Sequence, residues 1–258
     1  MNVSFVNSFR SEWLKRRHTA ASWIVIIGAA FMPLLVILMR LQDHGKPADK
    51  IFMKNIWAAM YHRNWTAMGM FLLPFMLILS TSLITNVEFK NNTWKQLHTT
   101  PQSLTTIYFA KLTVIMVMLI QLFLLFNIGI YLSVMLPGYI FSDLQLPTDP
   151  YPIRPYFRGT GYFFIDCLPV IALQYLLSLR FKNFIVPIGI GFSMLVIALL
   201  ALNWKYGYII PYIYTPLNFK ENQNFVDPLM NRHYWATGYF VVLTVVGFIL
   251  YVTKKEKG

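Results

Sequence analysis

Asp166 is the one carboxylate within the long apolar stretches of this sequence, and those stretches hold no lysine or histidine that could serve as the base for a serine nucleophile. If the stretches cross a membrane, an ionised carboxylate at the bilayer centre costs roughly 2.5–3.5 kcal/mol. Asp166 could therefore line a translocation path or relay ions. Alternatively, it reaches the outer interface or pairs with Arg154 or Arg158 nearby, and this second interpretation is the one that we favour.

Three uncharged polar residues, Gln121, Asn127 and Gln174, also lie in apolar stretches. Side chains of this kind usually form hydrogen bonds between membrane helices, and we expect that role here rather than ligand binding. Gln174 stays with Asp166 as a candidate lining residue of a path.

Motifs for other chemistry are missing from the sequence. It contains no GxxxxGK[ST] phosphate loop, no HExxH, no GxSxG and no CxxC. The five histidines never lie four residues apart, which argues against a metal site, and Cys167 is the only cysteine, which excludes a disulfide scaffold. The sequence predicts neither an enzyme nor a chain that binds ATP or another cofactor by itself.

The composition indicates an all-α polytopic membrane protein of one domain. Of the 258 residues, 57% are hydrophobic and only 12% are charged, and the mean hydropathy is +0.52. A membrane helix needs about 20 apolar residues. Six stretches meet this length, and four of them contain a proline that we expect to kink the helix (Pro33, Pro74, Pro169 and Pro187). The expected spans are 20–39, 67–85, 112–136, 161–179, 184–203 and 235–253.

Lysine and arginine are denser in the segments that lie inside if the N-terminus is cytoplasmic. We therefore expect both termini to lie in the cytoplasm and the spans to lie in the cell membrane. The net charge of +12 comes from short loops beside the spans, so it favours contact with anionic lipid over nucleic acid.

Residues 1–19 precede the first span and predict an amphipathic helix in the membrane interface. Apolar side chains that include Phe9 and Trp13 recur at spacings of three and four, and the cations Arg16 and Arg17 follow them. We expect the aromatic rings in the acyl boundary and the cations at the lipid head groups. A plain basic flank that orients the first span is the alternative.

The connection 86–111 predicts a short inner helix, a break and a second helix. Phe89, Thr93 and Leu97 share one helical stripe, and Pro101 ends the helix. Ser103 can then cap a helix that runs into the third span. The connection 204–234 is rich in tyrosine, and we expect it to dip back into the interface.

Together these features resemble the permease subunit of an ATP-binding-cassette exporter of the second type, and the closest branch includes the lantibiotic-immunity permeases. The resemblance implies that residues 88–101 are a coupling helix for a separate ATPase subunit and that the N-terminal helix is the elbow helix. The residues that carry the resemblance are Glu88, Thr93, Trp94, Lys95, Leu97, Pro101, Ser103 and Lys111.

The resemblance also implies the assembly and the task. Two permease chains, identical or different, would form the path, and two ATPase subunits would bind the ATP and Mg²⁺. The cargo would be a hydrophobic or amphipathic peptide antibiotic, lipid or drug. The alternatives are an ion-coupled secondary transporter, which would work without ATP and depend on Asp166, and a membrane-embedded enzyme acting on lipids or peptides.

Overall fold

In a computed structural model of the protein, the described residues are 5–17, 19–42, 56–90, 103–141, 144, 146–219 and 231–253, without the side chains of 88–90. Within these ranges the chain is all α-helical and has no strand, which confirms the predicted fold class. The elements are α1 (Phe5–Arg16), α2 (Ala20–Gln42), α4 (Ile56–Ala67), the π-helical turn η1 (Met68–Leu72), α5 (Leu73–Lys90), α7 (Leu104–Ile140), α8 (Ile153–Arg180), α9 (Ile185–Leu200), the 3-10 turns η2 (Ala201–Asn203) and η3 (Gly207–Ile209), α10 (Tyr214–Leu217) and α11 (Arg232–Val252).

Six helical stretches of the described chain are long and apolar enough to cross a membrane, as the sequence predicted. Two of them are much longer than expected. The second runs without interruption over Ile56–Val87 through α4, η1 and α5, and the third covers all 37 residues of α7. A helix of 37 residues is about 55 Å long, whereas the hydrocarbon core is about 30 Å thick. Both helices therefore continue well beyond the apolar core.

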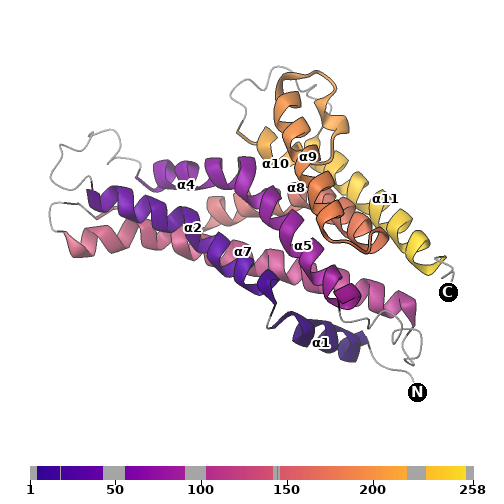
Figure 1. Cartoon of the computed structure of the whole chain (residues 1–258). Helices are drawn as coiled ribbons and strands as arrows, with labels where there is room; N and C mark the ends of the chain where they lie inside the picture. Colours follow the sequence, from indigo (N-terminus) through magenta and orange to yellow (C-terminus); the bar gives the residue numbers. More distant parts are fainter. Residues whose placement is uncertain are drawn as a thin grey trace.

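The helices form two connected pairs (Figure 1). α2 lies alongside α7, and α11 lies alongside α8, while α5 contacts α2, α8 and α9. The apolar windows of Ile56–Val87 and α8 are 61% and 67% buried, but that of α11 is only 17% buried. Thus α5 and α8 form the centre, and the exposed valines and leucines of α11 present an apolar face that suits lipid.

The α2–α7 contact depends on proline and glycine. A Cβ atom placed on Gly129 of α7 would lie 2.6 Å from Cγ of Pro33 in α2, so only glycine allows this approach. Further along α7, Pro137 has no N–H group for the carbonyl of Ser133. The buried side chain of Arg40 replaces it, because its Nη1 donates to the carbonyl oxygens of Ser133 (2.8 Å) and Val134 (2.7 Å).

The other prolines at which we expect helix kinks lie in different local structures. α8 continues through Pro169, and the π-helical turn η1 ends at Leu72, two residues before Pro74. Pro187 lies in the first turn of α9, where a missing N–H group leaves no helical bond unmade, so the expected kink at this position is wrong.

Aromatic packing holds α4 against the rest of the bundle. The fully buried ring of Trp65 stacks on Phe163 of α8, with centroids 4.1 Å apart and planes at 7°, and meets the edge of Phe126 of α7 at 4.9 Å. Such pairs contribute about 0.5–1.5 kcal/mol beyond the area that they bury. α4 is therefore a rigid extension of the second span.

Candidate functional site

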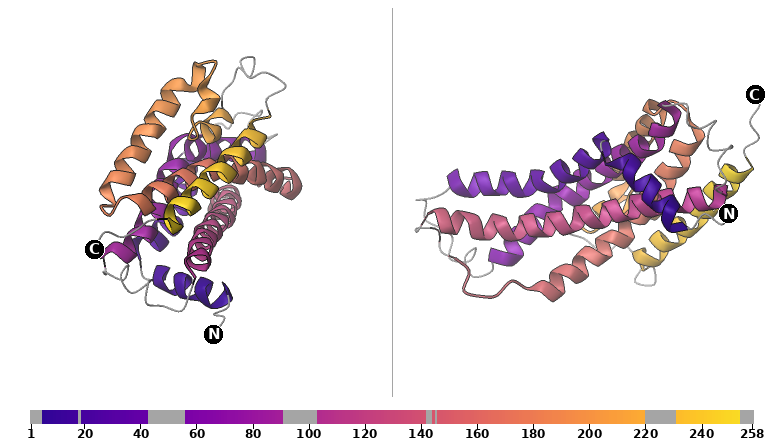
Figure 2. Two further views of the ribbon diagram at one scale, coloured as in Figure 1. Left: turned by 90° about the vertical axis from the view of Figure 1, so that its right-hand side faces the viewer. Right: turned by 90° about the horizontal axis from the view of Figure 1, so that it is seen from below.

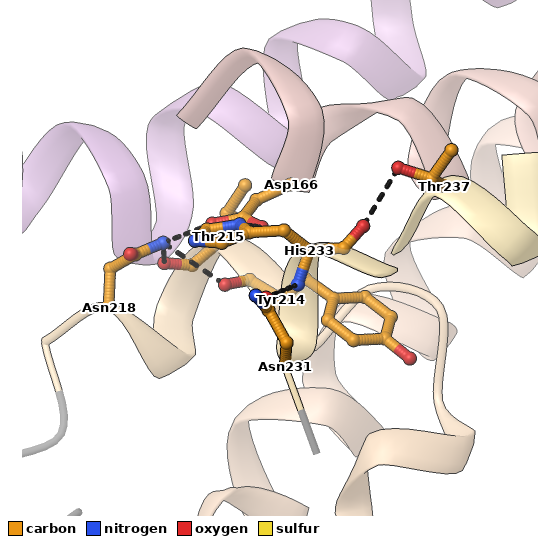
Figure 3. Close-up of polar contacts among 7 residues, drawn as sticks. All are labelled: Asp166, Tyr214, Thr215, Asn218, Asn231, His233 and Thr237. Atoms are coloured by element: carbon orange, nitrogen blue, oxygen red, sulfur yellow. Dashed lines mark hydrogen bonds and ion pairs between the residues drawn. The ribbon is translucent and has the colours of Figure 1, made fainter. Parts of the chain in front are cut away.

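Asp166 is fully buried at the junction of α8, α10 and α11 (Figure 3). Its Oδ1 lies 2.8 Å from Nδ1 of His233, and its Oδ2 accepts a hydrogen bond of 2.8 Å from Nδ2 of Asn218. The expected pairing with Arg154 or Arg158 is wrong. Asp166 faces the interior of the bundle, whereas both arginines are exposed and Arg158 contacts Tyr162 one turn along α8.

Local structure positions both partners of Asp166. His233 lies in the first turn of α11, where the side chain of the N-cap residue Asn231 accepts a hydrogen bond from the backbone N–H of His233. The imidazole ring of His233 stacks on the ring of Tyr162, with centroids 4.7 Å apart. Asn218 follows α10 and also donates to the carbonyls of that helix. The sequence missed His233 because the residue precedes the expected sixth span, although a histidine at the edge of a span is a signal that could have been followed.

The Asp166–His233 pair is shielded from solvent, because Asp166 is fully buried and His233 is largely buried. Such a pair also ties the start of α11 to the middle of α8. The described residues include no group of three or more His, Cys, Asp or Glu side chains, so this part of the chain offers no candidate metal centre.

Gln174 of α8 is a second buried polar centre, and all its bonds cross between elements. Its Nε2 donates to Oγ of Ser82 in α5 (2.8 Å) and to the carbonyl of Pro187 in α9 (2.9 Å), while its Oε1 accepts from the hydroxyl of Tyr212 (2.8 Å). Asn127 similarly bonds Thr160 across α7 and α8. The predicted interhelical hydrogen bonding is confirmed for both residues. Nothing in these contacts assigns Gln174 to a path.

The aromatic connection after α9 folds back onto the bundle. Tyr212 and Tyr214 are fully buried, and the Tyr214 hydroxyl donates to the carbonyl of Tyr208 (2.6 Å), while Tyr206 stays exposed. Within the described residues 204–219, part of this connection packs against the helices, and its expected position in the membrane interface stays a prediction. The same connection positions Asn218, whose amide donates a hydrogen bond to Asp166.

Helix α1 lies beside the first half of α7 (Figure 2), and charged side chains join the two helices. The Glu12 carboxylate is buried, contacts Lys15 in the same helix and lies 3.7 Å from Nζ of the buried Lys111 of α7. One turn along, Arg16 Nη2 donates to Oε1 of Gln121 (2.7 Å), which is the interhelical bond predicted for that glutamine. α1 is thus fixed to α7 by polar contacts at two levels.

The expected orientation of the N-terminal helix needs a correction at Arg16. Arg16 is buried between α1, α2 and α7, where it also donates to Oγ of Ser22 and lies over the Trp13 ring at 4.0 Å; burial lowers the pKa of its guanidinium group. Arg17 is exposed, and Phe9 and Trp13 are half-buried against the apolar core. Arg16 is drawn inside because it finds hydrogen-bond acceptors there, so it is not at the lipid head groups.

The inner connection between α5 and α7 is described only at its two ends. Glu88 and Phe89 lie in the last turn of α5, but their side chains are not described; Thr93, Trp94, Lys95, Leu97 and Pro101 lie outside the described residues. At the far end, Ser103 caps α7 as predicted, because its Oγ accepts from the N–H of Thr106 (3.1 Å). Lys111 follows two turns later and is buried.

The six apolar helices in the described part of the chain, with their exposed hydrophobic faces, define a multi-pass membrane protein. Residues 8–199, nearly three quarters of the chain, match the family model described as ABC-2 family transporter protein. The chain belongs to this family. It is therefore the membrane permease component of an ABC transporter rather than its ATPase, and the family implies association with an ABC ATPase. The chain has no significant match among curated proteins.

Proposed function

We propose that this protein is the permease of an ABC exporter and that a separate ATPase subunit drives it through residues 88–101. The observation that carries the proposal is the family match over residues 8–199, which includes this segment together with α1 and five of the six apolar helices. Glu88, Phe89, Thr93, Trp94, Lys95, Leu97 and Pro101 would form the docking surface.

The packing around the segment supports this role. Residues 88–101 connect α5 with α7, and α5 contacts α2, α8 and α9, while α7 is bonded to α1 through Glu12, Lys111, Arg16 and Gln121. A displacement of the segment would therefore act both on α5 at the centre of the bundle and on α7 beside it. Closely packed helices respond to such a displacement by shifting between discrete packing arrangements rather than by deforming continuously.

The complete assembly would hold two permease chains and two ATPase subunits, with ATP and Mg²⁺ bound in the latter. Both termini of the chain would face the cytoplasm of a bacterial cell. The cargo would be hydrophobic or amphipathic, and a peptide antibiotic in the manner of the lantibiotic-immunity branch is one form that it could take.

A second function, ion-coupled transport, is favoured by one observation, the buried Asp166–His233 pair. A proton-driven carrier would transport cargo in ATP-free proteoliposomes under a pH gradient and lose this activity in Asp166→Asn. The exporter hypothesis predicts that transport in such vesicles stops without ATP and the ATPase subunit.

The experiment that tests the proposal purifies the chain together with its candidate ABC ATPase and measures ATP hydrolysis. We expect Trp94→Ala or Glu88→Gln to reduce both co-purification and stimulated hydrolysis several-fold. Trp204→Ala is the matched control, because Trp204 is an exposed tryptophan at the turn after α9. Unchanged stimulation in both coupling variants would contradict the proposed docking surface.

A further inference from the structure

An open groove of about 680 Å³ runs between α2 and α4. Along α4 its lining is polar in the middle and formed by alanines on either side. The side chains that line it are Met32, Ala58, Ala59, His62, Arg63, Thr66 and Ala67. Three alanines leave the groove unfilled, and His62, Arg63 and Thr66 form its polar part.

The depth of the groove follows from α2. At 1.5 Å per residue, Met39 lies about 28 Å from Ala20, close to the full thickness of a hydrocarbon core. Arg63 Nη2 lies 3.1 Å from Sδ of Met39, so the guanidinium group of Arg63 is level with that membrane boundary. Met32 lies about 10 Å deeper along the same helix. The groove therefore joins the head-group level to the hydrocarbon at the end of α2 away from α1.

Arg63 differs from the other arginine at this depth. Arg40 is buried, and its guanidinium group is engaged by the carbonyls of Ser133 and Val134. Arg63 is exposed, and within the described part of the chain its only hydrogen-bond acceptor is the weak thioether of Met39. His62, beside it, contacts Thr66 through its Nδ1. Among the described residues, Arg63 thus has no carboxylate partner at the edge of the groove.

We propose that this groove is a binding site for an anionic phospholipid, with the phosphate at Arg63 and one acyl chain along Ala67 and Met32, which lie deeper than Arg63. Charge complementarity carries the choice of ligand, because a guanidinium group binds a phosphate oxygen pair in a fork geometry and the membrane boundary is where lipid phosphates lie. Ala67 leaves room for a methylene chain beside Met32. The site goes beyond the proposed transport function and requires neither nucleotide nor an ATPase subunit.

The test measures lipid retention by the full-length purified chain with native mass spectrometry, in detergent that contains phosphatidylglycerol or phosphatidylcholine. We expect phosphatidylglycerol to bind with at least fivefold preference. Arg63→Gln should weaken its binding about tenfold, as for the loss of one charge-assisted hydrogen bond. Arg154→Gln, which removes another exposed arginine near the start of α8, is the control and should leave binding unchanged.

Ala67→Trp tests the apolar part of the groove and should reduce retention of both lipids, whereas soluble glycerol phosphate should not displace phosphatidylglycerol. Because Arg63 is exposed, Arg63→Gln should fold even if Ala67→Trp does not. Equal phosphatidylglycerol binding in wild type and Arg63→Gln would overturn the proposal. So would a change of oligomeric mass in Ala67→Trp with lipid binding unaltered in Arg63→Gln, since a second copy of the chain would then cover the groove.

Discussion

The carboxylate of Glu12 in α1 lies 3.7 Å from Nζ of Lys111 in α7, and both side chains are buried. This contact joins the N-terminal helix to the span that directly follows the proposed coupling segment. Removing one partner of a buried ion pair leaves the other charge buried without compensation, which typically costs about 3–5 kcal/mol of folding free energy. The pair therefore makes the position of α1 dependent on the position of α7.

We expect Glu12→Gln to lower the melting temperature of the purified protein and to weaken ATPase coupling. Combination with Lys111→Met should cost less than the sum of the two single substitutions, by roughly 0.5–3 kcal/mol, because the charges lose their partners together. Lys15→Gln serves as the control, since Lys15 is more exposed and its pair with Glu12 is local to α1. Strict additivity of Glu12→Gln and Lys111→Met would show that the contact does not stabilise the junction.

Arg40 should be needed for stability only because Pro137 leaves the carbonyl of Ser133 without an N–H partner in the helix. Arg40→Met removes the donor to Ser133 and Val134, and leaving such a buried acceptor unsatisfied costs about 1–3 kcal/mol. In a Pro137→Ala background the new N–H group can bond the Ser133 carbonyl within the helix. Arg40→Met should then lower the melting temperature less than it does in wild type. An equal loss in both backgrounds would contradict this explanation.

The hydroxyl of Tyr212 should stabilise the connection after α9 through Gln174. Tyr212→Phe removes the 2.8 Å bond to Gln174 Oε1 and leaves that buried acceptor unsatisfied, at a cost of about 1–3 kcal/mol. The matched substitution Tyr206→Phe affects an exposed ring and should change the stability by less than about 0.5 kcal/mol. Thermal unfolding of both variants provides the comparison, and a similar loss in each would refute the role of Gln174.

Asp166 should hold the start of α11 in place. Asp166→Ala leaves His233 and the amide of Asn218 without their shared acceptor. We therefore expect faster hydrogen exchange at backbone amides around 233–240, whereas the opposite end of α11 should be unaffected. Asp149→Asn, which changes an exposed aspartate, is the control. Exchange that is as slow in Asp166→Ala as in wild type would show that the buried carboxylate does not hold this end.

The sequence allowed the six apolar helices to be predicted, because each needs a run of about 20 apolar residues that few soluble elements contain. Their ends were harder to place. α4 carries the polar run His62, Arg63 and Asn64 but no proline or glycine, so the helix continues beyond the hydrocarbon, where its backbone bonds remain favourable.

The polar contacts of the site depend on residues that are distant in the sequence. His233 is 67 residues from Asp166, and Gln121 is 105 residues from Arg16, so spacing alone could not pair them. One local signal was available: Ser8, Glu12 and Arg16 recur every four residues and form the polar stripe that α1 buries. The apolar periodicity of Phe9 and Trp13 obscured this stripe.

The central claim is that a cytoplasmic ATPase drives this permease through residues 88–101, and cysteine accessibility tests it most directly. Cys167 is buried and is the only cysteine, so Lys95→Cys in a Cys167→Ala background provides a single site for labelling. We expect a membrane-impermeant maleimide to react in inside-out vesicles only, and the bound ATPase to slow this reaction. Labelling from the outside of intact cells would contradict the account.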